Sequence, residues 1–109
     1  MAYFVCKLLP PRSTFPGDMT PEEGRLMGEH MAYWAELAAS GKAVIVGPVA
    51  DKAGFWGLAV VEVDAEADVQ AIVTNDPVTG DGSGFKYEVH PMPQALLRDS
   101  RPAARQAAQ

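Results

Sequence analysis

The chain has 109 residues, of which 48% are hydrophobic and 21% are charged, the size and composition of one soluble domain with one core. Its formal net charge of −5 argues against nucleic acid as a partner, because an acidic surface repels phosphate. No apolar run approaches the roughly 20 residues that a membrane helix needs, and the chain begins in a strand-like segment without a charged-then-apolar leader. We therefore expect a cytoplasmic protein that binds neither nucleic acid nor membrane.

Apolar runs and turn signals divide most of the chain into regular elements. The first helix has the clearest start, because Thr20 and Glu23 form a capping-box pattern and Pro21 occupies the first helical position. In chain order, the sequence predicts a strand over 2–9, a loop over 10–18, a helix from about 20 to 40, strands over 43–49 and 55–63, a helix over 64–74 capped by Asp64, and a strand over 85–89 that ends before Pro91.

The order strand, helix, strand, strand, helix, strand predicts the ferredoxin-like α+β fold, an antiparallel sheet with both helices on one face. We expect this domain to occupy residues 1–93. Residues 94–109 contain mostly Ala, Arg and Gln and offer little to bury. They are predicted to form a C-terminal tail that is frayed or docked.

The first and third strands are apolar on both faces, whereas a sheet with one face in water should alternate apolar and polar residues. In the first strand, Tyr3, Val5 and Leu9 lie opposite the face that carries Phe4, Cys6 and Leu8. No other segment of the chain is available to cover the second face. A second copy packed sheet against sheet is the simplest explanation, so a homodimer is predicted.

His30 lies on the apolar face of the first helix. Its neighbours three or four positions away are Leu26, Tyr33, Trp34 and, one turn further, Leu37. A buried imidazole held by a carboxylate is how proteins build a general base; the alternative is a core histidine bonded to a backbone carbonyl. Asp76 is the candidate partner, since the following Pro77 pins its backbone. The alternative for Asp76 is a residue that only ends the second helix.

Five further residues are candidate ligand contacts. Gly47 and Pro48 interrupt the second strand beside the first helix, which opens space there or marks a bulge. Arg12 and Phe15 lie in the proline-rich loop, which is either a lid whose arginine meets an anionic substrate or a solvated surface loop. Trp34 is expected to line the same cavity. Cys6 is expected to be an inert packed thiol, and one cysteine with two separated histidines does not make a metal site.

Together these pieces resemble the YciI-like, or YCII-related, family of small dimeric α/β proteins. The resemblance rests on the order and spacing of Tyr3-Phe4-Val5, Glu29-His30 with Tyr33-Trp34 and Leu37, Gly47-Pro48, Trp56-Gly57, Asp76-Pro77, and Tyr87-Glu88-Val89 before Pro91-Met92. It implies a ferredoxin-like fold that pairs into a dimeric α/β barrel, with a proposed active-site histidine and aspartate that fall on His30 and Asp76. At least one relative is a lyase that removes chloride from a chlorinated hydroxyquinol.

The residues and the resemblance together predict acid–base chemistry of the lyase or isomerase type. Asp76 would fix the tautomer of His30, which would take a proton from a hydroxyl or carbon of a small cyclic or aromatic substrate. No metal or organic cofactor is required. Two alternatives stay open: a binding module that holds a small ligand without turnover, and a monooxygenase of the related dimeric-barrel type.

Overall fold

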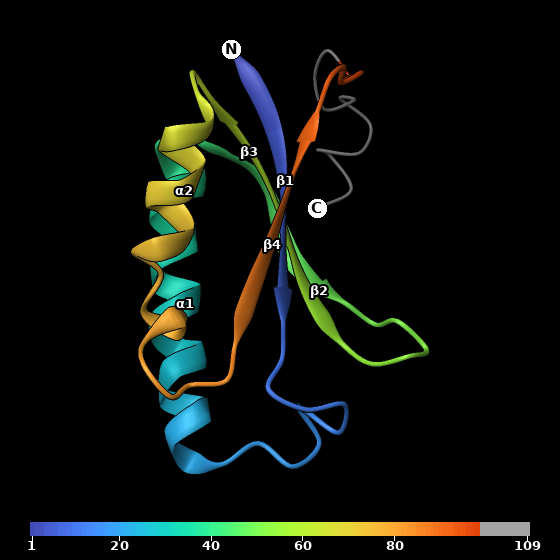
Figure 1. The fold of residues 1–109 in the computed structure, drawn as a ribbon, viewed down its shortest axis with the longest axis vertical. Helices are drawn as coiled ribbons and strands as arrows, with labels where there is room; N and C mark the ends of the chain where they lie inside the picture. The colour runs from blue at the N-terminus through green and yellow to red at the C-terminus, as the bar shows by residue number, and fades with distance from the viewer. Residues whose placement is uncertain (99–109) are drawn as a thin grey trace, which may run out of the picture.

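The computed structural model of the protein describes residues 1–98 and shows the expected ferredoxin-like α+β arrangement (Figure 1). Its elements are β1 (Ala2–Leu9), α1 (Pro21–Ala39), β2 (Ala43–Val49), β3 (Trp56–Val63), α2 (Glu66–Thr74), the short 3-10 helix η1 (Pro77–Thr79) and β4 (Lys86–Met92). Residues 94–98 follow β4 without regular secondary structure. The rest of the predicted tail, 99–109, lies outside the described residues.

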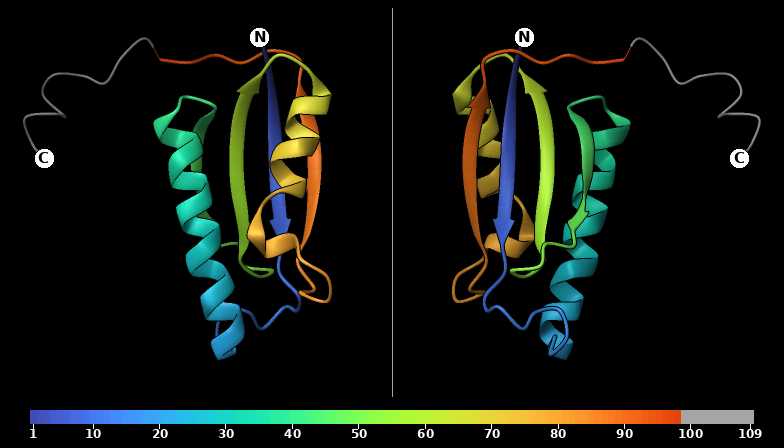
Figure 2. Two further views of the ribbon diagram at one scale, coloured as in Figure 1. Left: turned by 90° about the vertical axis from the view of Figure 1, so that its left-hand side faces the viewer. Right: turned by 90° about the vertical axis from the view of Figure 1, so that its right-hand side faces the viewer.

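The four strands form one antiparallel sheet in the order β2-β3-β1-β4. Both helices cover the same face of this sheet, and the other face is open in the described part of the chain (Figures 1 and 2). Neither helix within residues 1–98 combines the length and the apolar character that crossing a membrane requires. The sheet therefore has one face built into the core of this chain and one face that is available for contact.

Capping confirms the start of α1 and corrects the start of α2. The hydroxyl of Thr20 accepts the backbone N–H of Glu23 at 3.1 Å, and the Glu23 carboxylate accepts the N–H of Thr20 at 3.0 Å. The prediction that Asp64 caps α2 is wrong, because the helix starts two residues later, after Ala65. Asp68 instead reaches back from the first turn to accept the Ala65 N–H at 3.0 Å, which satisfies the helix start from inside.

The prolines of the two outer strands do not break them. Gly47 and Pro48 stay in register with β3, and the irregular pairing of β2 lies earlier, between Ala43 and Ile45. The prediction that Gly47-Pro48 interrupts the strand is therefore wrong. β4 likewise continues through Pro91 instead of ending before it. Both strands are edges of the sheet, where a missing backbone donor costs no ladder bond if it faces away from the neighbouring strand.

Two groups of buried side chains fill the space between the helices and the sheet. The larger group contains Phe4, Cys6, Trp34, Val61, Val69 and Ile72, among others. The smaller contains Leu8, Phe15, Val78 and Phe85, with the rings of Phe15 and Phe85 packed edge to face at 5.3 Å. Phe15 anchors the loop that carries it to the domain, while Ser13, Thr14 and residues 16–18 on either side of it are exposed.

The open sheet face is apolar at its centre. Val60 of β3 is the cross-strand partner of Val5 on one side and of Ile45 on the other. Strand alternation places all three on the face away from the helices. Ile45 is 57% exposed, and nothing in residues 1–98 packs over this face (Figure 2). The two-sided apolar character expected from the sequence is therefore present in the fold.

Two glycines in the loop before β4 allow a test of the close contact between this loop and Pro11. A Cβ added to Gly84 would lie 2.8 Å from the Cβ of Pro11, whereas one added to Gly82 would meet open space, and both glycines have positive φ, +82° and +76°. We expect Gly82→Ala to lower the free energy of unfolding by about 1–2 kcal/mol through backbone strain alone. Gly84→Ala should lower it further, as urea denaturation would measure. Equal losses would show that Pro11 does not hold this loop.

Candidate active site

His30 and Asp76, 46 residues apart in sequence, meet in the folded chain. Nδ1 of His30, on α1, lies 2.7 Å from Oδ2 of Asp76. Asp76 precedes η1 as its N-terminal cap, and its other carboxylate oxygen accepts the N–H of Val78 at 3.0 Å. The aspartate is thus a turn former and the partner of the histidine at once, so its two sequence interpretations do not exclude each other.

Two further side chains donate to the same oxygen of Asp76. The indole N–H of Trp34 lies 2.8 Å from Oδ2, and the hydroxyl of Tyr87, from β4, lies 2.5 Å from it. Asp76 is only 2% exposed. Burial by itself raises the pKa of this carboxyl, but the hydrogen bonds it accepts, first of all from His30, outweigh burial and hold the pKa below its ordinary value. Asp76 is therefore ionised near neutral pH.

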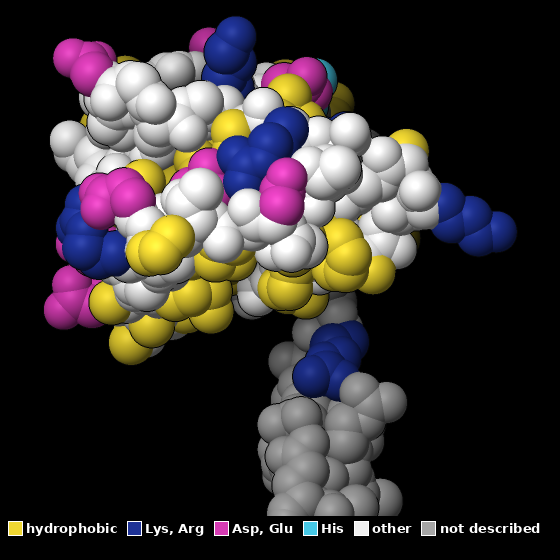
Figure 3. Space-filling view, turned by 90° about the horizontal axis from the view of Figure 1, so that it is seen from below, with side chains coloured by type: hydrophobic (Ala, Val, Ile, Leu, Met, Phe, Trp, Pro, Cys, Tyr) yellow, Lys and Arg dark blue, Asp and Glu magenta, His cyan; other side chains and the backbone are white. Residues whose placement is uncertain are grey.

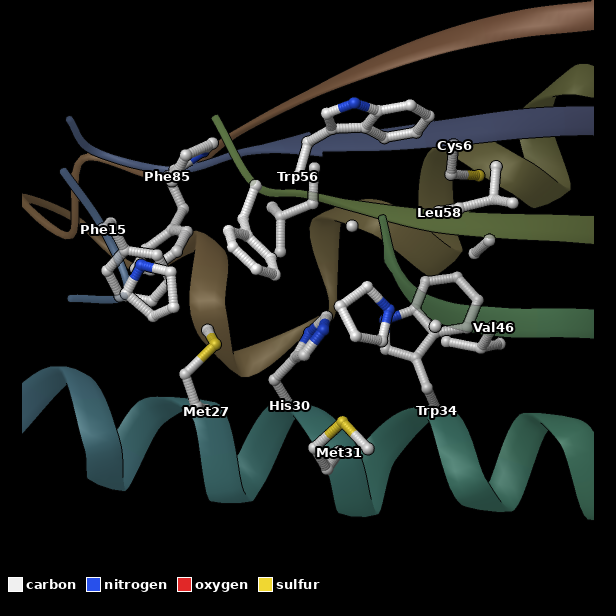
Figure 4. Close-up of a pocket in the computed structure, with 18 of the residues that line it drawn as sticks. Cys6, Phe15, Met27, His30, Met31, Trp34, Val46, Trp56, Leu58 and Phe85 are labelled. Atoms are coloured by element: carbon white, nitrogen blue, oxygen red, sulfur yellow. The ribbon is translucent and has the colours of Figure 1, made fainter. Parts of the chain in front are cut away.

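The ionised carboxylate decides the tautomer of His30. Because a carboxylate only accepts hydrogen bonds, the proton of a neutral imidazole must be on Nδ1, which leaves a lone pair on Nε2. The side chain of His30 is 12% exposed and projects from α1 toward the space between the helix and the sheet (Figure 4). An imidazole with an oriented tautomer and a free Nε2 is the ordinary arrangement of a general base.

A cavity of about 290 Å³ lies beside this imidazole, between α1 and the sheet. Besides His30, it is lined by Phe15, Trp34, Gly47 and Pro48, four of the five residues expected to contact a ligand. Figure 4 shows lining side chains from α1, from the loop before it and from the sheet. Among the residues that the structure describes, the lining includes no lysine, arginine, aspartate or glutamate. The cavity is therefore an apolar space with one basic nitrogen at its wall.

The structure places Arg12 away from this cavity. Its guanidinium donates to the Asp18 carboxylate at 2.9 Å and to both oxygens of the Glu23 carboxylate at 2.8 Å. The hydrogen bonds from Arg12 lower the pKa of Glu23 to about 2. The arginine thus ties the proline-rich loop to the first turn of α1, and it does not line the cavity with the other four predicted ligand contacts.

Sequence reasoning missed Tyr87 as part of the site. A signal was available, because Tyr87 and Val89 alternate on the inward face of a strand and a buried tyrosine hydroxyl needs a partner. Burial and the nearby Asp76 raise the pKa of Tyr87 well above its usual range, so the phenol keeps its proton and donates it. Cys6 also lines the cavity, and burial raises the pKa of its thiol to about 11, as expected of an inert packed thiol.

The side chains that commonly bind metals are scattered. Within residues 1–98, no three of the His, Cys, Asp and Glu side chains lie close enough together to hold an ion. His90, the second histidine, lies on the exposed side of β4, where its Nε2 is 3.5 Å from the Glu88 carboxylate. It is not part of the His30–Asp76 pair.

The comparison with known families agrees with the fold and the order of the motifs. The family model of the YCII-related domain matches residues 4–93, so the chain belongs to the YCII-related family. No curated protein matches the chain. The family match therefore supplies the class of domain, and the chemistry must be argued from the site itself.

The tautomer of His30 is open to direct measurement. Long-range ¹H–¹⁵N NMR distinguishes the two nitrogens of a neutral imidazole, and we expect His30 to carry its proton on Nδ1 because Asp76 accepts there. The exposed His90 serves as an internal control whose two tautomers should interconvert. A His30 proton on Nε2 would contradict the arrangement described here, since Nδ1 would then face the carboxylate without a hydrogen.

Proposed function

We propose that the protein is a small-molecule enzyme in which His30 and Asp76 carry out acid–base chemistry of the lyase or isomerase type on a small cyclic or aromatic substrate. The observation that supports this most is the 2.7 Å contact between Nδ1 of His30 and the buried Asp76 carboxylate at the wall of an apolar cavity. Two separate structural roles, a helix core residue and a turn former, would not require the two side chains to meet.

In this proposal, Nε2 of His30 takes a proton from an O–H or C–H bond of the substrate. The electron pair of that bond stays on the substrate, and the new imidazolium is stabilised by the Asp76 carboxylate on its other side. In an isomerisation the proton returns from Nε2 to another atom of the substrate. In an elimination the electron pair forms a double bond while a leaving group departs with its own bonding pair. A positioned base contributes on the order of 10²–10⁴-fold to such a step.

A binding module without turnover is the second candidate. This candidate is supported by the cavity wall, where His30 is the one basic side chain among the residues that the structure describes. A single hydrogen-bonding anchor in an apolar space is enough to hold a small ligand. The two candidates differ in one consequence. An enzyme requires the lone pair on Nε2 for a rate, whereas a binder requires it for affinity only.

Turnover can be tested with a panel of phenols, lactones and cyclic ketones in D₂O, followed by NMR for solvent deuterium uptake and for product. We expect His30→Gln to slow the reaction of an accepted compound by about 10²–10⁴-fold, because glutamine cannot take the proton. His90→Gln changes the exposed histidine and should leave the rate unchanged. Compounds that bind in the cavity but neither exchange nor react would favour the binding module, whereas compounds that react equally with His30→Gln would contradict His30 as the base.

We also propose that a second copy of the chain covers the open sheet face, so that two sheets pack into a dimeric α/β barrel. The support is the apolar centre of that face, where Val5, Val60 and Ile45 lie side by side and Ile45 is 57% exposed. An apolar surface of this kind on a sheet is stabilised by packing against a like surface across a two-fold axis.

Light scattering at micromolar concentration should give twice the chain mass of 11.6 kDa. Val60→Lys should shift the mass toward the monomer, because it places a charge at the centre of the apolar face. Met31→Lys, on α1 at the edge of the cavity and across the sheet from that face, adds the same charge and should leave the dimer intact. A monomeric wild-type protein, or equal effects of the two variants, would contradict the proposed interface.

A further inference from the structure

The electrostatics of the cavity restrict what it can hold. With a neutral imidazole, His30 and the ionised Asp76 together carry one net negative charge, and every described group that donates to Asp76 is uncharged in that state. The carboxylate is buried, so its field reaches the cavity with little screening by water. A second negative charge brought beside His30 would be repelled and also stripped of its hydration.

The basic side chains near the site are engaged elsewhere. Arg12 binds two carboxylates of its own chain. Lys7 places its ammonium over the ring of Trp56, 4.7 Å from the ring centre, and borders a neighbouring hollow instead of this cavity. In the described part of the chain no cation lines the cavity to pair with an anionic ligand. Arg12, which was expected to meet an anionic substrate, therefore does not line the cavity.

The entrance of the cavity is apolar as well. Met19, Met31 and Phe55 line it and are 38%, 58% and 43% exposed. Figure 3 shows hydrophobic side chains gathered along the lower edge of that view. Exposed apolar side chains that continue into a cavity form a path for an apolar ligand, and methionine adapts to ligands of different outline.

From these observations we infer that the site accepts uncharged apolar molecules of one or two rings that bear an acidic O–H or C–H group, and that it rejects carboxylates and phosphates. This inference rests on the proposed function in that it takes the cavity beside His30 as the ligand site. The volume of about 290 Å³ lies at the lower end of the range for small-ligand sites, which suits ligands of this size.

The same charge pattern suits the proposed proton transfer. A neutral ligand enters without adding charge, and the transfer to Nε2 then creates an anion directly beside the imidazolium that it has formed. The total charge of the site is unchanged by this step, because the proton only moves from ligand to histidine. A ligand that arrives already ionised has no proton to give at that position and faces the Asp76 charge without a counter-ion.

Calorimetric titration with three two-ring probes tests this selectivity without requiring turnover. At about pH 7, 2-naphthol and 2-naphthamide are uncharged and 2-naphthoate is an anion of nearly the same shape as the amide. We expect both neutral probes to bind the wild-type protein on the order of tenfold or more tightly than the naphthoate. Equal or tighter binding of the naphthoate overturns the inference, and so does failure of all three to bind at millimolar concentration.

Two matched variants test whether charge is the cause. Met31→Lys adds a cation at the entrance and should reduce the preference for neutral probes severalfold, whereas Val44→Lys adds the same charge on β2 away from the cavity and should leave it unchanged. An unchanged preference in Met31→Lys would overturn the electrostatic explanation. Preference for neutral probes without any turnover contradicts only the proposed enzyme, while His30-dependent turnover of carboxylates contradicts only this inference.

Discussion

The Asp76 carboxylate is the interaction on which the rest of this structure depends. One buried side chain accepts hydrogen bonds from α1 through His30 and Trp34, from the backbone of η1, and from β4 through Tyr87. α1 and β4 are linked directly as well, because the Trp34 indole N–H also lies 3.1 Å from the Tyr87 hydroxyl. A buried carboxylate is stable only when its hydrogen-bonding capacity is filled, so the fold must bring all four donors together for the charge to be tolerated. The same requirement fixes the orientation of the imidazole and leaves its second nitrogen toward the cavity.

The cavity exists because the elements around it are held apart at one end of the domain. The proline-rich loop is tied to α1 by Arg12, and it inserts Phe15 against Phe85, which forms one wall. β2, at the edge of the sheet, supplies the opposite side through Gly47 and Pro48. The wall therefore combines an ion-paired loop, an aromatic contact and an edge strand with reduced side-chain volume. These features lie outside the Asp76 network, whereas Trp34 and Tyr87 belong to both, since they donate to Asp76 and also line the cavity.

The fold and the His30–Asp76 pair could be predicted from the sequence because both depend on local residue patterns. The capping box at Thr20 fixed the start of α1, helical spacing placed His30 on its inner face, and the string before Pro77 identified Asp76 as a constrained acid. Predictions failed where strand order decided the outcome. Whether a proline breaks a strand depends on whether that strand is an edge, which only the assembled sheet determines. The ion pair between Arg12 and Glu23 could not be predicted either. The capping box already explained Glu23, and nothing in the sequence indicates that the preceding loop brings Arg12 to the same carboxylate.

The ties made by Arg12 have a consequence for how the domain responds to its solvent. The arginine side chain is 34% exposed, so dissolved salt weakens its attraction to the two carboxylates. The Asp76 carboxylate is shielded from water, and ions in solution hardly reach its hydrogen bonds. Ionic strength therefore acts on one end of the cavity and not on the other. In concentrated salt the ion pairs that hold the proline-rich loop to α1 weaken while the imidazole keeps its orientation, so the rigidity of the wall that carries Phe15 is the part of the cavity that depends on ionic strength.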